Sequence, residues 1–468
     1  MADSVNDSGM AGARPAQAPG IRLSEVLSAL SFALDITEGQ PEGHALRSCL
    51  IGMRLAREIG LPAERHAPLY YALMLKDLGC SSNAAKVCSL FGADDIAVKR
   101  GLKTVDWTSL PESFVYVAGH AAPGGSMLRK AIRILTMSLG GARGQSELFR
   151  TRCERGSEIA RMLELPEATS SAIRALDEHW DGKGQPAGLR GARIPLEGRI
   201  LCLAQTVEVF FTERGVGPAC EMARQRSGAW FDPELVEALL SFETDAAFWT
   251  GLASGEIARQ AAAADPEDRV LIAGQQRLER VARAFAMVVD AKSPWTYRHS
   301  EGVAEIAAGV GERLGLRHHE LHALKLAALL HDIGKLGISN VILDKPAGLT
   351  AQERESMKQH VEHTYRILHR VSGLRDVAEI AGSHHERLDG TGYWRGLPAE
   401  RLSPSVRVLV VADMCEALMA DRPYRKRLTA AQTLDLMSSE VGTGICPAAF
   451  VALQQFLSTT GYTPQRAA

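Results

Sequence analysis

The chain has 468 residues, of which 46% are hydrophobic and 23% are charged, a balance typical of a globular protein. Its length alone predicts roughly two to four domains. Lysine and arginine number 53 against 55 aspartates and glutamates, for a formal net charge of -2, so no global basic field attracts nucleic acid or an anionic membrane. We therefore expect no DNA or RNA partner and no membrane partner, and a charged ligand must meet a local cluster of side chains.

The N-terminal residues 1–20 are small, polar and rich in Pro and Gly, without the basic start and apolar run of a signal peptide. We predict a disordered tail there. Later apolar runs such as SVRVLVVADM are too short to cross a bilayer, which needs about 20 apolar residues, so we expect a cytoplasmic protein. The 8 cysteines are scattered without a CxxC pair, and we interpret them as buried free thiols.

The sequence repeats itself over long distances. Residues 35–80 align with residues 290–335 without a gap, and residues 181–205 align in the same way with residues 389–413. Between these matches the N-terminal half carries extra chain. Apolar residues recur at helical spacing throughout, with little of the alternation of a sheet. The sequence therefore predicts an all-α protein with two tandem helical bundles over 21–248 and 275–460, joined by an Ala-rich linker over 249–274 that we expect to be helical.

Histidines gather in the second bundle. Ten of the 14 histidines lie between His299 and His385, and histidines clustered with aspartates are typical of a metal site. A lone histidine is more often a hydrogen-bonded or surface residue than a ligand, but an ordered set favours a metal centre. The set is larger than one tetrahedral ion can use, so we predict two metals that share Asp332 as a bridging carboxylate. The predicted ligands are His299, His331, Asp332, His360, His384, His385 and Asp413.

Several separated motifs in this bundle occur in the order of a known family. They are HDIGK (331–335), KQH (358–360), SHHERLDGTGYWRGL (383–397), VVAD (410–413) and ADRPYR (420–425). With them, residues 290–455 resemble the HD-GYP phosphodiesterases, a branch of the HD superfamily. The resemblance implies a helical bundle that holds two or three metal ions, usually iron or manganese. Members with three metals carry Glu four residues before the first ligand, where this chain has Trp295, so we expect two divalent ions, Fe or Mn.

The resemblance also implies an activity. Such enzymes hydrolyse cyclic dinucleotides, above all cyclic di-GMP, and we expect conversion of that substrate to linear pGpG, GMP or both through a metal-bridging hydroxide. The tandem layout resembles phosphodiesterases that act on 3',3'-cyclic GMP-AMP, which is the alternative substrate. Two further hypotheses are a catalytically weak cyclic-dinucleotide receptor and a general HD hydrolase of nucleotides or phosphomonoesters.

Further residues acquire roles from these motifs. We predict Asp332 and Lys335 as catalytic residues, because an ammonium one helical turn from the first HD residue can offset charge on the phosphate. By resemblance, Arg422 and Arg425 bind substrate phosphates or guanine edges. Asp389 and Tyr393 belong to the loop that names the family and are expected to bind substrate.

That loop departs from the family pattern at Trp394, where its members usually have Pro. Without the fixed dihedral of Pro, we expect a different loop geometry, and a Trp is able to stack on a base.

The first bundle has lost most of the ligand set. His44 and Asp77 remain, but an ammonium repels a metal ion and an amide is a poor ligand, so we predict no dinuclear centre there. This half is then a scaffold, a homodimerisation surface, or a sensor that serves a signalling partner. The replacements in this alignment are Lys76 for His331, Cys153 for His360, Asp177 and Glu178 for His384 and His385, and Gln205 for Asp413.

Overall fold

The computed structural model describes residues 21–267, 270–271, 275–296, 298–421 and 425–464. Over these ranges the chain is helical apart from loops and one two-stranded antiparallel sheet, β1 (Ile21–Arg22) with β2 (Val270–Leu271). The all-α prediction is therefore confirmed. The predicted tail over 1–20 lies outside the described residues. No described helix is both long enough and apolar enough to cross a membrane.

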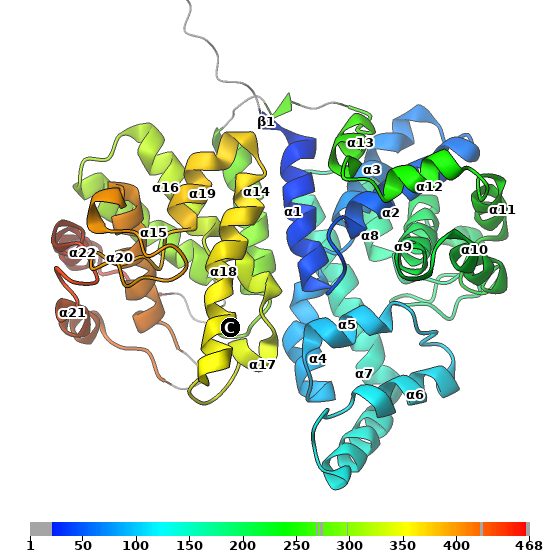
Figure 1. Ribbon diagram of the computed structural model, residues 1–468, viewed down its shortest axis with the longest axis horizontal. Helices are drawn as coiled ribbons and strands as arrows, with labels where there is room; N and C mark the ends of the chain where they lie inside the picture. The colour runs from blue at the N-terminus through cyan, green and yellow to red at the C-terminus, as the bar shows by residue number, and fades with distance from the viewer. Residues whose placement is uncertain (1–20, 268–269, 272–274, 297, 422–424, 465–468) are drawn as a thin grey trace, which may run out of the picture.

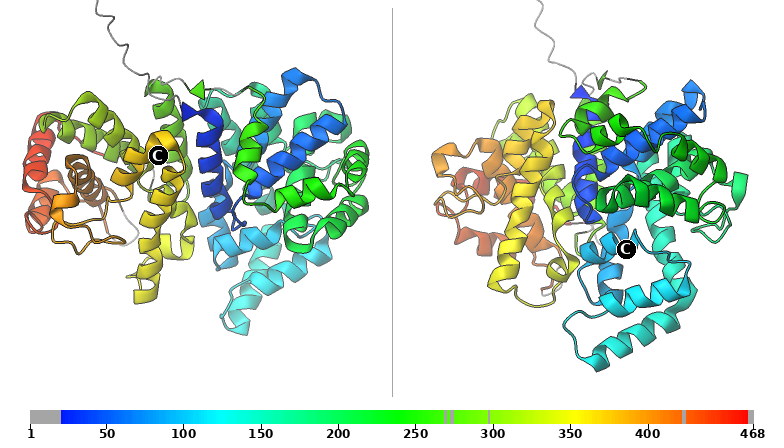
Figure 2. Two further views of the ribbon diagram at one scale, coloured as in Figure 1. Left: turned by 45° about the horizontal axis from the view of Figure 1, so that its top comes forward. Right: turned by 45° about the vertical axis from the view of Figure 1, so that its right-hand side comes forward.

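The two halves of the chain lie side by side (Figures 1 and 2). The first half contains α1 (Leu23–Thr37), α2 (His44–Glu58), α3 (His66–Leu75), α4 (Ala84–Phe91), α5 (Asp95–Leu102), α6 (Leu110–His120), α7 (Met127–Met162), α8 (Glu167–Arg174), α9 (Leu196–Arg214), α10 (Val216–Gln225) and α11 (Pro233–Ser241). Two short helices, α12 (Ala246–Leu252) and α13 (Ile257–Ala263), follow in the region expected to link the bundles.

The second half contains α14 (Gln275–Asp290), α15 (His299–Arg313), α16 (His318–Leu330), α17 (Asn340–Leu343), α18 (Ala351–His369), α19 (Arg375–Ala381), α20 (Pro404–Met419), α21 (Ala430–Ser438) and α22 (Pro447–Thr460). A short 3₁₀ helix, η4 (Ile333–Gly337), follows α16. Local sequence sets these starts. Thr350 and Glu353 form a capping box before α18, and the Ser403 side chain accepts a hydrogen bond from the backbone N–H of Val406 ahead of Pro404 at the start of α20.

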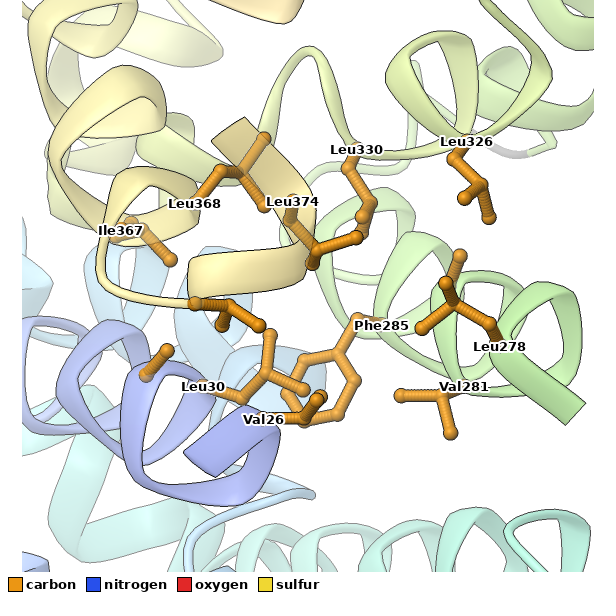
Figure 3. Close-up of a pocket in the computed structure, with 13 residues that line it drawn as sticks. Val26, Leu30, Leu278, Val281, Phe285, Leu326, Leu330, Ile367, Leu368 and Leu374 are labelled. Carbon is orange, nitrogen blue, oxygen red and sulfur yellow. The ribbon is translucent and has the colours of Figure 1, made fainter. Parts of the chain in front are cut away.

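Helix α1 joins the two halves through apolar contacts (Figure 3). Val26 and Leu30 on this helix face Phe285 on α14 and Ile367 and Leu368 on α18 across a void of about 10 Å³. A void of this size and apolar lining holds at most one water molecule. Buried side chains of both halves thus belong to one contiguous core.

A buried polar contact also links the halves. Asp95 on α5 accepts a hydrogen bond from the backbone N–H of Asn340 at 2.8 Å, and its other oxygen lies 3.5 Å from Nζ of Lys292. The side chains of Asp95 and Lys292 are 0% and 1% exposed, so the pair is fully withdrawn from water. Such a pair is costly to break, because removal of one partner leaves the other charge buried.

Two glycines fix the register of the repeat. A Cβ atom on Gly334 would lie 2.0 Å from the carbonyl oxygen of His360, and a Cβ atom on Gly79 would lie 1.9 Å from that of Arg152. Both halves therefore need glycine where one helix meets the backbone of the next. Arg152, and not Cys153, is the counterpart of His360. The sequence alignment is wrong by one residue at this position, because the extra chain before α7 contains no matching residues that fix the register.

A second repeated contact corrects the register of the double histidine. Glu178 accepts hydrogen bonds from backbone N–H groups 9 and 11 residues further along, and Glu386 does the same. Glu178 is therefore the counterpart of Glu386. The residue before it, Asp177, corresponds to His385, and His384 corresponds to a leucine.

Candidate metal centre

The seven predicted ligands converge in the second half from five helical segments. His299 begins α15, His331 and Asp332 follow α16, and His360 lies on α18. His384 and His385 follow α19, and Asp413 lies on α20. Three overlapping groups among them bring their ligand atoms within 4.8 Å of one another: His299 with His331 and Asp332; His331 with His384 and Asp413; and His360 with His384 and His385.

Three of the histidines are oriented by the same backbone contact. Nδ1 of His331, His360 and His384 donates to the carbonyl oxygen three residues before it, at 2.8, 2.6 and 2.6 Å. A carbonyl can only accept, so Nδ1 carries a proton, and in the neutral ring the lone pair of Nε2 points to the other side. This is the tautomer that a metal ligand requires.

Asp332 stands between two groups of histidines. Its Oδ2 lies 3.5 Å from Nε2 of His299 and 3.4 Å from Nε2 of His331. Its Oδ1 lies 3.6 Å from Nε2 of His360 and 3.7 Å from Nε2 of His384. One carboxylate thus presents each oxygen to a different histidine pair, which is the arrangement that a bridging ligand between two cations would have.

Several of these atoms are buried and have no hydrogen-bond partner among the described residues. They are Nε2 of His299, Nε2 of His331 and Oδ1 of Asp332. Their nearest polar neighbours are other atoms of the same cluster, at 3.3–3.7 Å, which is too far for well-formed hydrogen bonds. A divalent cation would pair with all three, so the donor set fits a metal with nitrogen and oxygen ligands.

Glu416 is a part of the site that the sequence analysis missed. It lies one turn after Asp413 on α20, and its carboxylate pairs with Nδ1 of His299 in a site where both side chains are buried. The contact holds the His299 ring with Nε2 toward Asp332 and Asp413, the latter at 3.3 Å. The repeat carried a signal, because Glu208 makes the same contact in the other half.

Electrostatics divide the histidines into two classes. Burial opposes protonation of His331, but Asp332 and Asp413 outweigh it and raise the pKa to about 9. At His360 burial prevails over the attraction of Asp332 and lowers the pKa to about 3. The pKa of Asp332 is held well below its ordinary value, because His331 and Lys335 outweigh the effect of burial. The two carboxylates therefore favour a positive charge beside them, either a protonated imidazole or a metal ion.

The predicted catalytic lysine lies at the centre. Nζ of Lys335 donates to Oδ2 of Asp332, and its side chain is 19% exposed, so the ammonium is near the carboxylate and still reaches solvent. Tyr393 is also close, with its ring 4.6 Å from that of His385 and Nζ of Lys358 lying 5.6 Å from its centre. These groups could face an anionic substrate beside the histidines.

The other predicted substrate contacts have structural partners of their own. Asp389 accepts hydrogen bonds from the N–H and hydroxyl of Thr391 and pairs with Arg387, so it shapes its own loop. Arg425 donates to the carbonyl oxygens of Leu418, Lys426 and Ala417 beside the end of α20. Arg422 lies outside the described residues. Substrate binding by these three stays a prediction.

Trp394 has a left-handed backbone, with φ of 39°, a conformation unusual for a bulky residue. Its ring packs 5.0 Å from Tyr365 on α18, and the Arg395 guanidinium lies 4.8 Å from its centre. The ring is 39% exposed. The indole is thus held against α18 with part of its surface open to solvent.

Side-chain cations occupy the matching place in the first half. Nζ of Lys76 donates to Asp77 and, at 2.9 Å, to Nε2 of His44, while Lys103 pairs with the other oxygen of Asp77 at 3.3 Å. Arg152, the counterpart of His360, pairs with Asp177. Glu38, Asp77 and Cys80 lie close enough to hold an ion, but Lys103 already pairs with both carboxylates.

A model of the HD domain family matches residues 117–235 and 283–447, and so reaches into both halves. The 3'3'-cGAMP-specific phosphodiesterase 3 of Vibrio cholerae is 39% identical over 436 residues, which cover 93% of this chain and 95% of that protein. The chain belongs to the HD domain family. This confirms the family resemblance drawn from the motifs.

A solved relative shows the fold of this HD domain protein. A crystal structure of a cyclic GMP-AMP specific phosphodiesterase of Vibrio cholerae matches with a TM-score of 0.65 at 35% identity, covering 94% of this chain and 98% of that one. A cyclic di-GMP phosphodiesterase of Thermotoga maritima is 40% identical over 150 residues, which cover 32% of this chain and 41% of that protein. The tandem architecture is therefore shared with the Vibrio protein.

Proposed function

We propose that this protein is a metal-dependent phosphodiesterase that hydrolyses cyclic dinucleotides, with 3',3'-cyclic GMP-AMP as its preferred substrate. The observation that carries the catalytic part is Asp332, whose two oxygens face two histidine pairs. The relatives named above are cyclic-dinucleotide phosphodiesterases, which supports the enzyme class. The relative that aligns with both halves is named for cyclic GMP-AMP. It favours the alternative substrate of the sequence analysis over cyclic di-GMP.

Two divalent ions, Fe or Mn, would be held by the convergent ligands. Asp332 would contact both ions, and the histidines whose Nδ1 atoms are already bound to carbonyl oxygens would offer Nε2. When bound, such ions supply Lewis acidity at the phosphate and make a water molecule more acidic.

The chain's own residues position the substrate. Lys335, held beside Asp332, neutralises a phosphate oxygen as charge develops on it. Tyr393 and Lys358 form a wall next to His385, where a ring and a cation face the same space. In this proposal Arg422 and Arg425 act at the substrate phosphates, and Asp389 keeps the loop of Tyr393 in shape.

Cyclic di-GMP is the second candidate substrate. The Thermotoga relative, named for that dinucleotide, supports it, although its match covers only 32% of this chain. Both candidates share two phosphodiesters in one ring and differ in one base. The choice between them therefore depends on contacts to the base and not on the metal ligands.

The first half has a separate role in this proposal. We divide the chain into an HD-like half over 21–248, a linker over 249–274 and a catalytic half over 275–460. Side-chain cations at Lys76 and Arg152 leave the first half without a dinuclear centre. It serves as a scaffold, and as a surface for a homodimer or a signalling partner.

The activity is tested with protein purified without oxygen and loaded with Fe(II) or Mn(II). Each cyclic dinucleotide is incubated separately, and the products are resolved by chromatography. We expect turnover of both, with a higher kcat/KM for cyclic GMP-AMP. Binding of either dinucleotide without turnover would refute the enzyme proposal, and a higher kcat/KM for cyclic di-GMP would reverse the substrate preference.

Two variants control this experiment. Asp332→Ala is expected to abolish metal loading and turnover, because it removes the carboxylate shared by both histidine pairs. His44→Gln changes the equivalent ligand position in the other half and should leave turnover within about twofold, with folding checked by circular dichroism. Loss of chemistry in a folded His44→Gln protein contradicts the assignment of the catalytic half.

A further inference from the structure

The first half contains a large cavity at the place where the second half has its metal ligands. Its volume is about 660 Å³, within the range of small-molecule sites, and Arg152, Asp177 and Gln205 line its inner end. These residues are the counterparts of His360, His385 and Asp413. The metal centre of one half is thus matched by an open volume in the other.

Extra chain builds much of the wall of this cavity. The spacing between equivalent residues falls from 255 before the extra chain, as for Gly79 and Gly334, to 208 after it, as for Arg152 and His360, so the first half holds 47 more residues here. They include α5, α6 and the first part of α7, which supply Leu102, Val117 and Met137 to the lining. The cavity is therefore an addition to the repeated fold.

The inner end of the cavity is charged. Lys99, Lys103 and Arg152 line it together with the carboxylates of Glu38 and Asp177, three cations against two anions. Each of these five side chains is mostly withdrawn from solvent, and Nε of Arg152 has no hydrogen-bond partner among the described residues. Lys99 and Lys103 also pair with the buried carboxylates of Asp95 and Asp77, which in turn pair with Lys292 and Lys76. The connected cluster therefore holds five cations and four carboxylates, and a monovalent anion would balance the excess positive charge.

An aromatic wall follows the charged end. The ring of Trp107 lies 4.6 Å from Phe149, 4.8 Å from His179 and 5.9 Å from Trp230. His179 and Trp230 stack at 4.0 Å. These side chains bound one side of the cavity with ring surface, and Nδ1 of His179 and Nε1 of Trp230 have no hydrogen-bond partner among the described residues.

The mouth of the cavity is apolar and open. Phe114 on α6 lines it and is 60% exposed. Helix α6 and the start of α7 project from the first half in Figure 1, away from the shared core. Their large exposed side chains are Phe114, Val115, Met127, Leu128, Ile132 and Leu135. Exposed apolar side chains on α6 and the start of α7 are typical of a surface that binds an apolar ligand or partner.

We propose that this cavity binds an amphipathic organic acid, with its carboxylate at Lys103 and Arg152 and its apolar body along the aromatic wall toward Phe114. The charges lie at the buried end and the apolar side chains at the mouth, which matches a ligand with one acidic head and a long hydrocarbon body. A nucleotide fits less well, since its phosphate carries about two negative charges where the cluster has one positive charge in excess. A neutral apolar ligand leaves the excess cation unbalanced.

The proposal is tested by isothermal titration of the full-length protein with oleate below its micellar concentration. We expect one oleate per chain, and at least tenfold weaker binding of oleyl alcohol, which lacks the carboxylate. Equal binding of the alcohol overturns the assignment of the charged end. Absence of oleate binding overturns the site. So does a result in which one 5'-GMP binds per chain and oleate does not displace it.

Matched substitutions on α6 locate the ligand. Val117 lines the cavity, whereas Val115 is 71% exposed and does not. Val117→Trp should fill the cavity and weaken oleate binding at least tenfold, and Val115→Trp should leave it unchanged. Equal affinities of the two variants contradict the site. Because the readout is binding, it does not depend on the proposed phosphodiesterase activity.

Discussion

The contact between Glu416 and His299 offers the sharpest test of how the metal ligands are held. In Glu416→Gln the side chain keeps its shape and can still accept from Nδ1, but the hydrogen bond is no longer charge-assisted. Hydrogen bonds to charged groups contribute about 1.5–3 kcal/mol, roughly twice the neutral value. The variant therefore loses about 1–1.5 kcal/mol of the free energy that holds the His299 ring in place, and metal affinity should fall roughly tenfold.

Removal of the partner altogether should cost more. In Glu416→Ala the His299 ring is free to turn in a buried site, and substitutions of residues that orient ligands typically cost about 10–100-fold in affinity or activity. We expect this variant near the upper end of that range. Affinity is measured by competition with a chelator that reports free Mn(II), and turnover is measured at saturating metal, where Glu416→Gln should recover much of its activity.

The repeat provides the control. Glu208 makes the same contact with His44 in the first half, where we propose no metal centre. Glu208→Gln should therefore leave metal affinity within about twofold, whatever it does to stability. Unchanged affinity in Glu416→Gln, or an equal loss in Glu208→Gln, refutes the reasoning.

Three further outcomes are expected. Gly334→Ala places Cβ 2.0 Å from the carbonyl oxygen of His360 and should cost about 3 kcal/mol and lower the metal content, so an unchanged Tm contradicts the close approach. Burial outweighs the attraction of Asp95 and lowers the pKa of Lys292 from 10.5 to about 8. Between pH 8 and pH 10.5 the unfolded chain therefore binds more protons than the folded chain, and the free energy of unfolding rises with pH. The free energy of unfolding should rise by about 3 kcal/mol relative to Lys292→Met over this window, and parallel pH profiles from denaturant titrations argue against the buried charge. A chelator should lower the Tm of the metal-loaded protein but not that of Asp332→Ala, because the metal stabilises only the folded chain that binds it.

The sequence placed the seven predicted ligands in short motifs on separate helical segments, and the structure brings them together. That they bind metal stays a prediction. His331 and Asp332 follow α16, and Asp413 lies two turns into α20. Glu416 was missed because a single Glu in an apolar helix has no motif of its own. Its contact appears only when α15 and α20 pack together.

The register of the first half was wrong by one residue for the same kind of reason. Periodicity sets the face of a helix but not its offset after an insertion, so Cys153 was taken for the counterpart of His360. The close approach at Gly79 to Arg152 decides the matter, and it is a property of packing. The cavity could not be predicted from the sequence either, because its volume depends on how the inserted helices pack against the bundle.

The placement of α1 has a consequence for how this protein can change. Val26 and Leu30 are buried against Phe285 and Ile367, so the first half supplies part of the apolar interior of the second half. Truncation of the chain between the two halves would remove α1 and expose these apolar side chains of the second half, which would then tend to aggregate. Because the two repeats share one interior, the second half depends on the first for part of its apolar packing, whatever chemistry the first half carries out.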